Sequence, residues 1–391
     1  MSPVRLRRGA REPLRVRTPA SLLHVLTEGA EPLAGGADPN AAALELAIVI
    51  PPFRRGSGGH HTIADLVRGL EARGHRVELW LEDDERRHDG ESGQRTESLF
   101  NEFFGAVSAS LRRDVNAFAG ADVVVATGWQ TVPRALSLPG ARARAYLVQD
   151  HEPEFYGASA ERLWAQWTFR QGLHCICASP WLAELVRDAY GASATSFDLG
   201  VGDAYQSLPT HRRDDLVLAY ARAVTPRRAV PLVLLAMEEL HRRRPNVEIA
   251  LFGEARPIAT SFPYRDLGVL EPAALAHAYA SAAVGIVASL TNPSLVPSEM
   301  LACGLPVVDL ALPAMVATFG SDGPIELVQP DPLALADAVE RLLDDLVLRA
   351  EHSRAGAEWV ASRTWDHAAR QVEDGLREAL RLAQAGPSSH G

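Results

Sequence analysis

The sequence predicts an α/β protein of two domains, each built on a parallel, doubly wound sheet. At 391 residues the chain is longer than one hydrophobic core usually serves. Apolar, strand-like runs alternate with segments of helical periodicity through residues 41–204, and the same alternation restarts in 215–361. Strands that alternate with helices at this spacing form parallel sheets. We therefore expect two cores, joined by the polar stretch 205–215.

The first domain is predicted from apolar runs that end in turn residues. A Gly/Arg loop, 51–59, separates the first strand from a helix over 60–73, whose apolar residues recur every three or four positions. The predicted strands of this domain are 46–50, 76–81, 123–127, 145–149, 175–178 and 195–199. Residues 1–40 show little periodicity, so we expect an extension that is either mobile or laid on a neighbour. Its arginines at 5, 7, 8 and 11 are the groups that would touch an anionic membrane surface.

The second domain repeats the pattern of the first. Its predicted strands are 216–220, 247–252, 267–270, 283–288 and 307–310, and its predicted helices are 229–243, 272–282, a short helix that opens around Ser298, and 332–347. A last helix over 366–385 ends the chain. No internal repeat is evident beyond these two similar halves.

Composition argues against several classes of protein. The net charge of −10 argues against a general nucleic-acid binder, because neutralising phosphates needs an excess of basic side chains. The three cysteines, 175, 177 and 303, are too few for a disulfide framework and lack a second pair for a zinc site. No apolar run is long enough to span a membrane, and the Arg-rich start lacks a signal core. A cytoplasmic protein is therefore expected.

The sequence contains no lysine, so all 39 basic residues are arginine. This excludes a Schiff-base lysine and the lysine of a P-loop. Any phosphate clamp must use guanidinium groups, which bind two oxygens at once and stay charged. Arg222, Arg227 and Arg228 follow the first strand of the second domain, at the sheet edge where parallel sheets bind ligands. The alternative is a solvated basic loop before a helix.

The most informative stretch is 284–310, which is typical of a strand, a Pro/Ser loop, a short helix and another strand. Free N–H groups at the start of such a helix bind phosphate, and a carboxylate in its first turn, Glu299, can accept hydrogen bonds from ribose hydroxyls. An ordinary helix also prefers Glu near its start. The other candidate ligand contacts in this loop are Asn292, Ser294 and Leu295.

A second cluster of polar groups follows the predicted strand 145–149. Gln149, Asp150, His151 and Glu152 come one after another, and a plain loop does not need such a density of titratable groups. We expect Gln149, Asp150 and Glu152 to face the space between the domains. The alternative for Asp150 is to cap the following turn.

Weaker candidates end other strands. Gly58, Gly59 and His60 precede or open the first helix, where we expect ligand contact. Trp129 offers a ring on which a sugar could stack, although Trp is more often a core residue. Gly253 ends a strand of the second domain, where it either lets the backbone approach a ligand or forms a plain tight turn.

No metal site is predicted. His60 and His61 are adjacent on a helix, so their side chains point about 100° apart. Asp83 and Asp84, the nearest candidate acidic ligands, read as part of a solvated turn. We expect neither a metal nor another cofactor.

Two of these stretches resemble one family. Glu-Met-Leu-Ala-Cys-Gly-Leu-Pro-Val-Val, which starts at Glu299, resembles the second half of the Glu-x7-Glu signature of family 4 glycosyltransferases, enzymes of the GT-B fold. The first Glu of the signature falls on Thr291, a departure that leaves its sugar-holding role without an occupant. Asn292-Pro293-Ser294 fits the His-Pro-Ser of a subgroup, the rhamnosyltransferases of bacterial surface polysaccharide synthesis. Residues 149–156 resemble the Gln-Asp-Tyr/His-Glu-Pro-x-Phe-Tyr segment of the same subgroup.

The resemblance implies two Rossmann-like, doubly wound domains that face each other across a cleft. It also implies that residues 362–391 form a helix that returns to the first domain. The activity implied is metal-independent and retaining, and it moves a sugar from a nucleoside-diphosphate donor to a hydroxyl. The sugar would be a deoxyhexose such as rhamnose, and the acceptor a glycan, a lipid-linked sugar or a small molecule.

The resemblance also implies roles for residues. Arg222 matches an Arg of the family, and Arg227, with Arg228 beside it, takes the place of its Lys, so that both clamp the diphosphate. Gln149 and Asp150 would orient the sugar or the acceptor, and in an inverting enzyme the base would be Asp150 or Glu152. The remaining donor contacts implied are Glu299, Gly58, Gly59, Gly253, Asn292, Ser294 and Leu295, and the acceptor contacts are Trp129, His151 and His60. The missing first Glu also permits a noncatalytic binding partner of the same fold.

Overall fold

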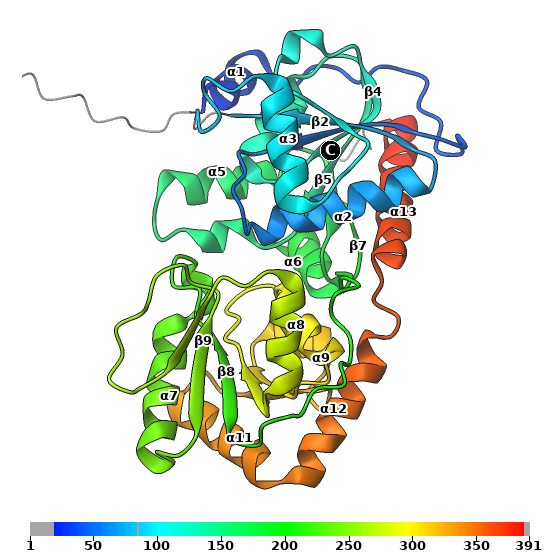
Figure 1. Cartoon of the computed structure of the whole chain (residues 1–391). Coiled ribbons are helices and arrows are strands. Elements are labelled where there is room, and N and C mark those ends of the chain that lie inside the picture. The colour runs from blue at the N-terminus through cyan, green and yellow to red at the C-terminus, as the bar shows by residue number, and fades with distance from the viewer. Residues whose placement is uncertain (1–18, 84–85, 387–391) are drawn as a thin grey trace, which may run out of the picture.

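The computed structural model describes residues 19–83 and 86–386. The arginines at 5, 7, 8 and 11 lie outside these ranges. The described chain forms two lobes, each with one parallel sheet covered by helices (Figure 1). A segment without strands or helices, 197–215, joins the two lobes.

The N-lobe sheet has seven parallel strands in the order β3-β2-β1-β4-β5-β6-β7. The strands are β1 Glu45–Ile50, β2 Arg76–Leu81, β3 Ser110–Arg112, β4 Ala121–Ala126, β5 Ala141–Val148, β6 His174–Cys177 and β7 Ala194–Ser196. The helices are α1 Ala20–Glu28, α2 Gly58–Ala72, α3 Gly93–Phe104, α4 Val132–Ser137, α5 Ala160–Thr168 and α6 Pro180–Tyr190, with 3-10 turns η1 Val115–Ala117, η2 Trp129–Thr131 and η3 Glu152–Phe155. The strand β3 was not predicted, because its three residues alternate polar and apolar only once.

The C-lobe sheet has six parallel strands in the order β10-β9-β8-β11-β12-β13. The strands are β8 Leu216–Tyr220, β9 Glu248–Phe252, β10 Arg265–Gly268, β11 Val284–Ile286, β12 Val307–Leu310 and β13 Ile325–Val328. The helices are α7 Val230–Arg243, α8 Pro272–Ser281, α9 Leu295–Ala302, α10 Pro313–Phe319, α11 Pro332–Asp344 and α12 Leu346–Val360, and the 3-10 turn η4 is Pro226–Arg228. The prediction of two parallel α/β sheets is confirmed.

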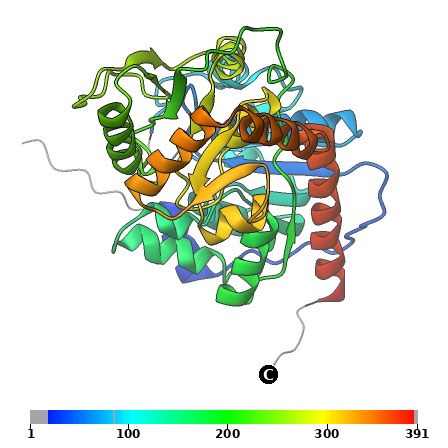
Figure 2. The ribbon, with the colours of Figure 1, turned by 90° about the horizontal axis from the view of Figure 1, so that it is seen from below.

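The core of the N-lobe forms where apolar stripes of two helices meet the sheet. Ile63 and Leu66 recur on one face of α2 and are buried with the inward side chains of β1. The last helix, α13 (Trp365–Ala385), adds Val372 and Leu376 to the same core, so it packs beside α2 (Figures 1 and 2). Burial of these side chains holds the C-terminal end of the chain on the first lobe.

A glycine gives a test of this helix packing. Replacing a glycine inside a helix by alanine normally stabilises the helix by about 0.5–1 kcal/mol. Gly69 of α2 is expected to do the opposite, because an added Cβ would overlap the Cβ of Ala369 in α13. We expect Gly69→Ala to lower the free energy of unfolding by about 1–3 kcal/mol, measured by urea denaturation. The control is Gly93→Ala, where an added Cβ meets nothing within 4 Å; equal stability of the two variants would contradict the close packing.

Two predictions of the sequence fail in the fold. The expected helix over 332–347 is divided into α11 and α12 at Asp345, whose carboxylate accepts from the N–H groups of Val347 and Leu348. A side chain that caps a new helix start competes with continuation of the old helix. The mobile alternative for the N-terminal extension is also wrong for residues 19–40, which are laid on the N-lobe.

The described part of that extension is packed on the N-lobe. Leu22 and Val25 of α1 are 4% and 6% exposed, and α1 lies against α4. The N–H of Ala34 donates to the carbonyl of Ala141, which ties the following segment to the start of β5. A helix of nine residues has weak propensity in isolation and depends on such packing, which sequence periodicity does not show.

Candidate active site

The carboxyl ends of strands from both sheets meet where the lobes touch. From the N-lobe come the glycine loop after β1 and the residues after β5 and β6, and from the C-lobe come the loops after β8 and β11. Parallel sheets bind ligands at this edge, outside the carboxyl ends of their strands. Most of the predicted site residues lie on these loops.

Asp150, which follows β5, joins the two lobes directly. Its Oδ2 accepts from the hydroxyl of Thr291 at 2.9 Å and lies 3.1 Å from Nε of Arg227. Its Oδ1 accepts from the backbone N–H of Asn292 at 3.1 Å and of His151 at 2.9 Å. Asp150 is 6% exposed, and each of its two oxygens contacts protein groups.

Asn292 is fully enclosed between the lobes, with an exposed fraction of 0%. Its Nδ2 donates to the carbonyls of Gln149 at 3.1 Å and Ala178 at 3.2 Å, and its Oδ1 accepts from the hydroxyl of Ser179 at 2.7 Å. The side chain therefore contacts the opposite lobe on all sides. The predicted contact of Asn292 with the ligand stays a prediction, because these hydrogen bonds are all made within the protein.

Arg222 reaches toward the opposite lobe. A Cβ built on Gly56 would lie 3.9 Å from Nη1 of Arg222, so the guanidinium borders the glycine loop. Gly58 and Gly59 follow at the exposed start of α2, and Nε2 of Gln149 donates to the carbonyl of Gly59 at 3.2 Å. No carboxylate of residues 19–83 and 86–386 forms an ion pair with Arg222. The structure thus brings together four of the predicted residues, from both lobes.

Buried polar atoms at the C-lobe edge include three without a hydrogen-bond partner within the described chain. They are Nε of Arg227, which faces Asp150 as an ion pair only, Nη1 of Arg228, a residue 6% exposed, and the hydroxyl of Ser294, the residue that precedes α9. Asp309 lies near Arg228, and burial raises the pKa of Asp309 to about 6 although Arg228 acts against that rise. Unpartnered buried polar atoms cost free energy, and a bound anion would remove that cost.

Helix α9 begins at Leu295, not around Ser298 as predicted. The reason is Pro297, which was read as a loop residue. Proline is tolerated in the first helical turn, because N–H groups there have no partner within the helix. Glu299 consequently lies in the second turn of α9, and its predicted place in the first turn is wrong.

Glu299 is 9% exposed and faces two tyrosines. Burial raises the pKa of its carboxyl to about 8, although the hydroxyls of Tyr279 and Tyr205 act in the opposite direction. Tyr279 belongs to α8, whereas Tyr205 belongs to the segment that joins the lobes. The carboxyl group is therefore held mainly in its protonated form at neutral pH.

Glu152 turns into the N-lobe, and its predicted position facing the cleft is wrong. Its carboxylate accepts from the backbone N–H of Trp129 and from the hydroxyl of Tyr146, both at 2.8 Å. Burial raises its pKa to about 7, and these two hydrogen bonds partly offset the rise. The residue links β5 to the turn after β4.

Removing this carboxyl is expected to destabilise the fold. Glu152→Ala leaves two buried donors without an acceptor, which costs about 1–3 kcal/mol for each donor. Glu152→Gln keeps an acceptor oxygen and is expected to lose less. Urea denaturation of both variants measures the difference. A Glu152→Ala protein with unchanged stability and lost turnover would restore the residue to catalysis.

The three residues predicted to contact the acceptor are all buried in the N-lobe, and their acceptor contact stays a prediction. Trp129 is 1% exposed, and its indole N–H donates to the hydroxyl of Tyr156 at 3.0 Å. His151 is 8% exposed, and its Nε2 lies 2.7 Å from the hydroxyl of Tyr190. His60 is 7% exposed, and burial lowers its pKa to about 4. All three support the N-lobe from inside.

A tight turn explains why position 253 is a glycine. Its φ is +96°, and an added Cβ would lie 2.6 Å from the ring of Tyr220. Of the two alternatives left by the sequence, the structure thus favours the turn.

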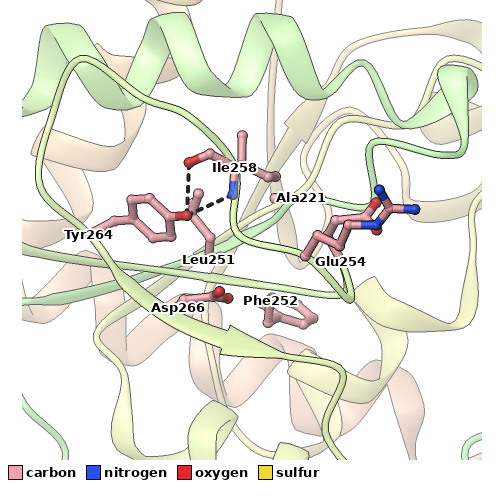
Figure 3. A pocket seen from close by; sticks show the side chains of 8 residues that line it. Ala221, Leu251, Phe252, Glu254, Ile258, Tyr264 and Asp266 are labelled. Atoms are coloured by element: carbon pink, nitrogen blue, oxygen red, sulfur yellow. Dashed lines mark hydrogen bonds between the residues drawn. The ribbon is translucent and has the colours of Figure 1, made fainter.

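A small pocket lies beside this turn (Figure 3). It is a shallow hollow open to solvent, with about 160 Å³ of free space, and it is lined by Ala221, Leu251, Phe252, Glu254, Arg256, Ile258, Tyr264 and Asp266. The hydroxyl of Tyr264 bonds the backbone N–H and carbonyl of Ile258, both at 2.8 Å, which closes one wall. The pocket combines apolar surface with two carboxylates.

Sequence reasoning missed Phe155, Ser179 and Tyr205. The guanidinium of Arg227 lies over the ring of Phe155, 4.0 Å from its centroid. Phe155 belongs to the segment 149–156, so its position near polar groups was an available signal. Nothing in the sequence marks Ser179 or Tyr205, because their contacts come from distant parts of the chain.

Within the described ranges, no group of three or more His, Cys, Asp and Glu side chains is arranged to hold a metal ion. None of the helices in these ranges combines the length and the apolar character that crossing a membrane requires.

Family models match both lobes. The model described as Glycosyltransferase Family 4 matches residues 56–197, from the glycine loop to β7. The model described as Glycosyl transferases group 1 matches residues 214–345, which contain the whole C-lobe sheet. The chain belongs to the family 4-like glycosyltransferases of GT-B fold. The resemblance to family 4 glycosyltransferases is thereby confirmed, and the resemblance to the rhamnosyltransferase subgroup stays a prediction.

One curated relative of this glycosyltransferase is the O-antigen biosynthesis protein RfbC of Myxococcus xanthus. The two are 29% identical over 341 residues, which is 84% of this chain and 26% of the relative. The chain thus spans about a quarter of the length of the curated relative it matches.

Solved structures share the fold at low identity. Sucrose-phosphate synthase of Thermosynechococcus elongatus superimposes with a TM-score of 0.64 at 15% identity, over 87% of this chain and all of that chain. Anabaena HepE in complex with UDP-glucose gives a TM-score of 0.64 at 14% identity, over 86% of this chain and 99% of that chain. These likenesses support the GT-B arrangement of the two lobes.

Proposed function

We propose that this glycosyltransferase moves a sugar from a nucleoside-diphosphate donor to a hydroxyl group of a glycan. The observation that carries the proposal is the set of positive groups at the carboxyl edge of the C-lobe sheet. Arg222 borders the glycine loop, Arg228 holds a buried nitrogen without a partner, and the unpartnered hydroxyl of Ser294 marks the start of α9. Guanidinium groups and a helix N-terminus together suit a diphosphate.

In the proposed reaction the bond between C1 of the sugar and the phosphate oxygen breaks. A new bond forms between C1 and the acceptor oxygen, and the acceptor proton passes to the departing phosphate. Arg222 and Arg227 stabilise the charge that builds on the leaving group. Gln149 contacts the sugar from the N-lobe, and Gly58, Gly59 and Leu295 border the donor.

A retaining reaction without a metal is the finer part of this proposal. Protein groups engage both oxygens of Asp150, and Glu152 faces the N-lobe interior. Neither carboxylate is free to act as a general base, and front-face attack assisted by the leaving phosphate needs none. Arginines and the dipole of α9 supply the positive charge that a metal supplies elsewhere.

The nucleoside end of the donor is proposed to lie along the C-lobe. Glu299 accepts hydrogen bonds from the ribose, and the pocket in Figure 3 takes the base against Phe252, with Asp266 and Glu254 as hydrogen-bond acceptors. Both carboxylates also accept from backbone N–H groups, Glu254 from those of Val224 and Ala255 and Asp266 from that of Gly268.

The identities of the sugar and the acceptor are proposed from similarity to related proteins. Resemblance to rhamnosyltransferases and similarity to an O-antigen biosynthesis protein support a deoxyhexose donor and a surface-polysaccharide acceptor. A lipid-linked sugar is among the proposed acceptors. Peripheral contact with a membrane is supported by Leu23 and Leu26 of α1, which are 65% and 58% exposed and follow the Arg-rich start of the chain.

A donor panel tests the proposal. Purified protein is incubated with nucleoside-diphosphate sugars, dTDP-rhamnose among them, with and without glycan acceptors, and released nucleoside diphosphate is measured. We expect release that requires an acceptor. Thermal stabilisation by a donor without release would instead identify a noncatalytic binding protein.

A further inference from the structure

The contact between the lobes is concentrated in a small buried cluster, which we call the interlobe junction. It consists of Asp150 and Ser179 from the N-lobe and Arg227, Thr291 and Asn292 from the C-lobe. Asp150, Thr291 and Asn292 are 6%, 6% and 0% exposed. The junction lies at the carboxyl ends of β5 and β6, beside the proposed donor site.

Hydrogen bonding in the junction is complete on the Asn292 side chain. Both hydrogens of its Nδ2 are donated to N-lobe carbonyls, and its Oδ1 accepts from the hydroxyl of Ser179. Separation of the lobes would exchange these hydrogen bonds for hydrogen bonds to water, so the set favours contact between the lobes by their net free energy. The arrangement needs no ligand atom.

The junction also orients an arginine of the proposed donor site. Nε of Arg227 faces Asp150 at 3.1 Å, and its guanidinium lies over the ring of Phe155. Both partners belong to the N-lobe, whereas Arg227 belongs to η4 of the C-lobe. Because Nε is the atom that faces Asp150, the terminal nitrogens of Arg227 stay available for a diphosphate.

We propose that Asn292 and Asp150 are positioning residues that dock the lobes in the ligand-free protein and set the orientation of Arg227. Asn292 contributes the docking, and Asp150 contributes both the docking and the orientation. The effect on turnover rests on the proposed function, whereas the docking does not. The donor then binds to an assembled site, and its binding free energy is not reduced by the cost of closing the lobes.

Docking is tested without any substrate. Small-angle X-ray scattering of ligand-free Asn292→Ala is expected to show a larger radius of gyration than that of the wild type. Leu290→Ala is the matched control, because Leu290 lies in the same loop and is 45% exposed. A scattering profile of Asn292→Ala identical to that of the control would overturn the docking role.

A second pair of variants changes the junction less, so that its effect can be measured even if Asn292→Ala misfolds. Thr291→Val removes one hydrogen bond to Asp150 without changing shape, and Thr291→Ser keeps it. Amide exchange in the peptide 287–295 of the ligand-free protein is expected to be several-fold faster in Thr291→Val and to return to the wild-type rate in Thr291→Ser. Equal exchange in all three proteins would contradict the junction.

Orientation of Arg227 is tested by Asp150→Asn, which loses the charge that faces Arg227. The amide oxygen can still accept from the N–H of Asn292, and the amide NH2, which replaces Oδ2, can donate to the hydroxyl of Thr291. We expect unchanged scattering and a kcat lowered by about tenfold, with a smaller change in donor KM. Wild-type kcat in this variant, in an enzyme whose acceptor-dependent turnover is established, would remove the orienting role. Absence of turnover in the wild type itself would instead contradict the proposed function. Docking of the lobes would still be tested by the scattering experiment.

Discussion

Replacing Arg222 by alanine is expected to lower kcat by about 10²–10³-fold. Departure of a nucleoside diphosphate builds negative charge on the leaving group, and one well-placed donor stabilises such a transition state by roughly 3–4 kcal/mol. Arg222 is placed for this role because its guanidinium borders the glycine loop of the other lobe and no described carboxylate pairs with it. The measurement is acceptor-dependent release of nucleoside diphosphate at saturating donor.

The fold is expected to survive this change. Arg222 is half-buried and holds no ion pair within the described chain, so the far-ultraviolet circular dichroism and the urea midpoint should match those of the wild type. Arg242→Ala is the matched control, because Arg242 is an arginine of the same lobe that is 70% exposed on α7. Arg222→Lys keeps the charge but loses the forked geometry, so partial activity is expected. Near-normal kcat in Arg222→Ala would remove the diphosphate clamp.

Sheet architecture was predictable because both sheets are buried on two faces. Strands such as β1 and β8 are nearly continuous apolar runs, and turn residues separate them from helices with a regular apolar stripe. The errors are of a different kind. Pro297 was read as a loop residue although it lies within the first turn of α9, and Asp345 divides a helix whose apolar pattern alone shows no interruption.

The residues predicted for the site differ in whether their contacts depend on strand position or on distant parts of the chain. Arg222 and Gly59 were assigned from strand ends, and the structure brings them to one edge because parallel strands end together. Trp129 and Glu152 were assigned from the same rule, yet they form one hydrogen-bonded unit inside the N-lobe. Residue type and strand position do not say toward which side of a loop a side chain turns. Only the three-dimensional packing decides that.

Asn292 shows the same limit in a more useful way. A family pattern placed it beside the donor, and it does lie in that loop, but its amide is engaged by three N-lobe groups. The partners directly follow β5 and β6, more than a hundred positions earlier in the chain. Contacts at that separation cannot be read from local sequence, although they fix the relation between the two lobes.

Glu299→Gln is expected to change how stability depends on pH. Burial raises the pKa of Glu299 to about 8, above the value of about 4.5 for an unfolded chain. The native state therefore holds this proton more tightly than the unfolded chain does. The stability that the protonated carboxyl contributes is fully present below pH 4.5 and is lost as pH rises through 8. Between these values the free energy of unfolding of the wild type falls by up to about 1.4 kcal/mol per pH unit from this group. Glutamine stays neutral, so the variant lacks that slope.

Urea denaturation at pH 5.5, 6.5 and 7.5 measures this difference. The wild type is expected to lose about 2 kcal/mol relative to Glu299→Gln across the series, because one proton bound only in the native state is given up. Glu28→Gln, at the exposed end of α1, is the control and should follow the wild type. A pH-independent difference between wild type and Glu299→Gln would show that the carboxyl is already ionised at pH 5.5.

The same carboxyl links donor binding to protons. Ribose hydroxyls donate to a carboxylate and favour its charged form, so donor binding near pH 7 is expected to release a fraction of a proton. Calorimetric titration with a nucleoside diphosphate, in two buffers of different ionisation enthalpy, measures that release. In Glu299→Gln we expect no release and an affinity lowered by about tenfold, which is roughly 1.4 kcal/mol. Proton release that persists in the variant would assign it to another group, and unchanged affinity would remove Glu299 from the ribose site.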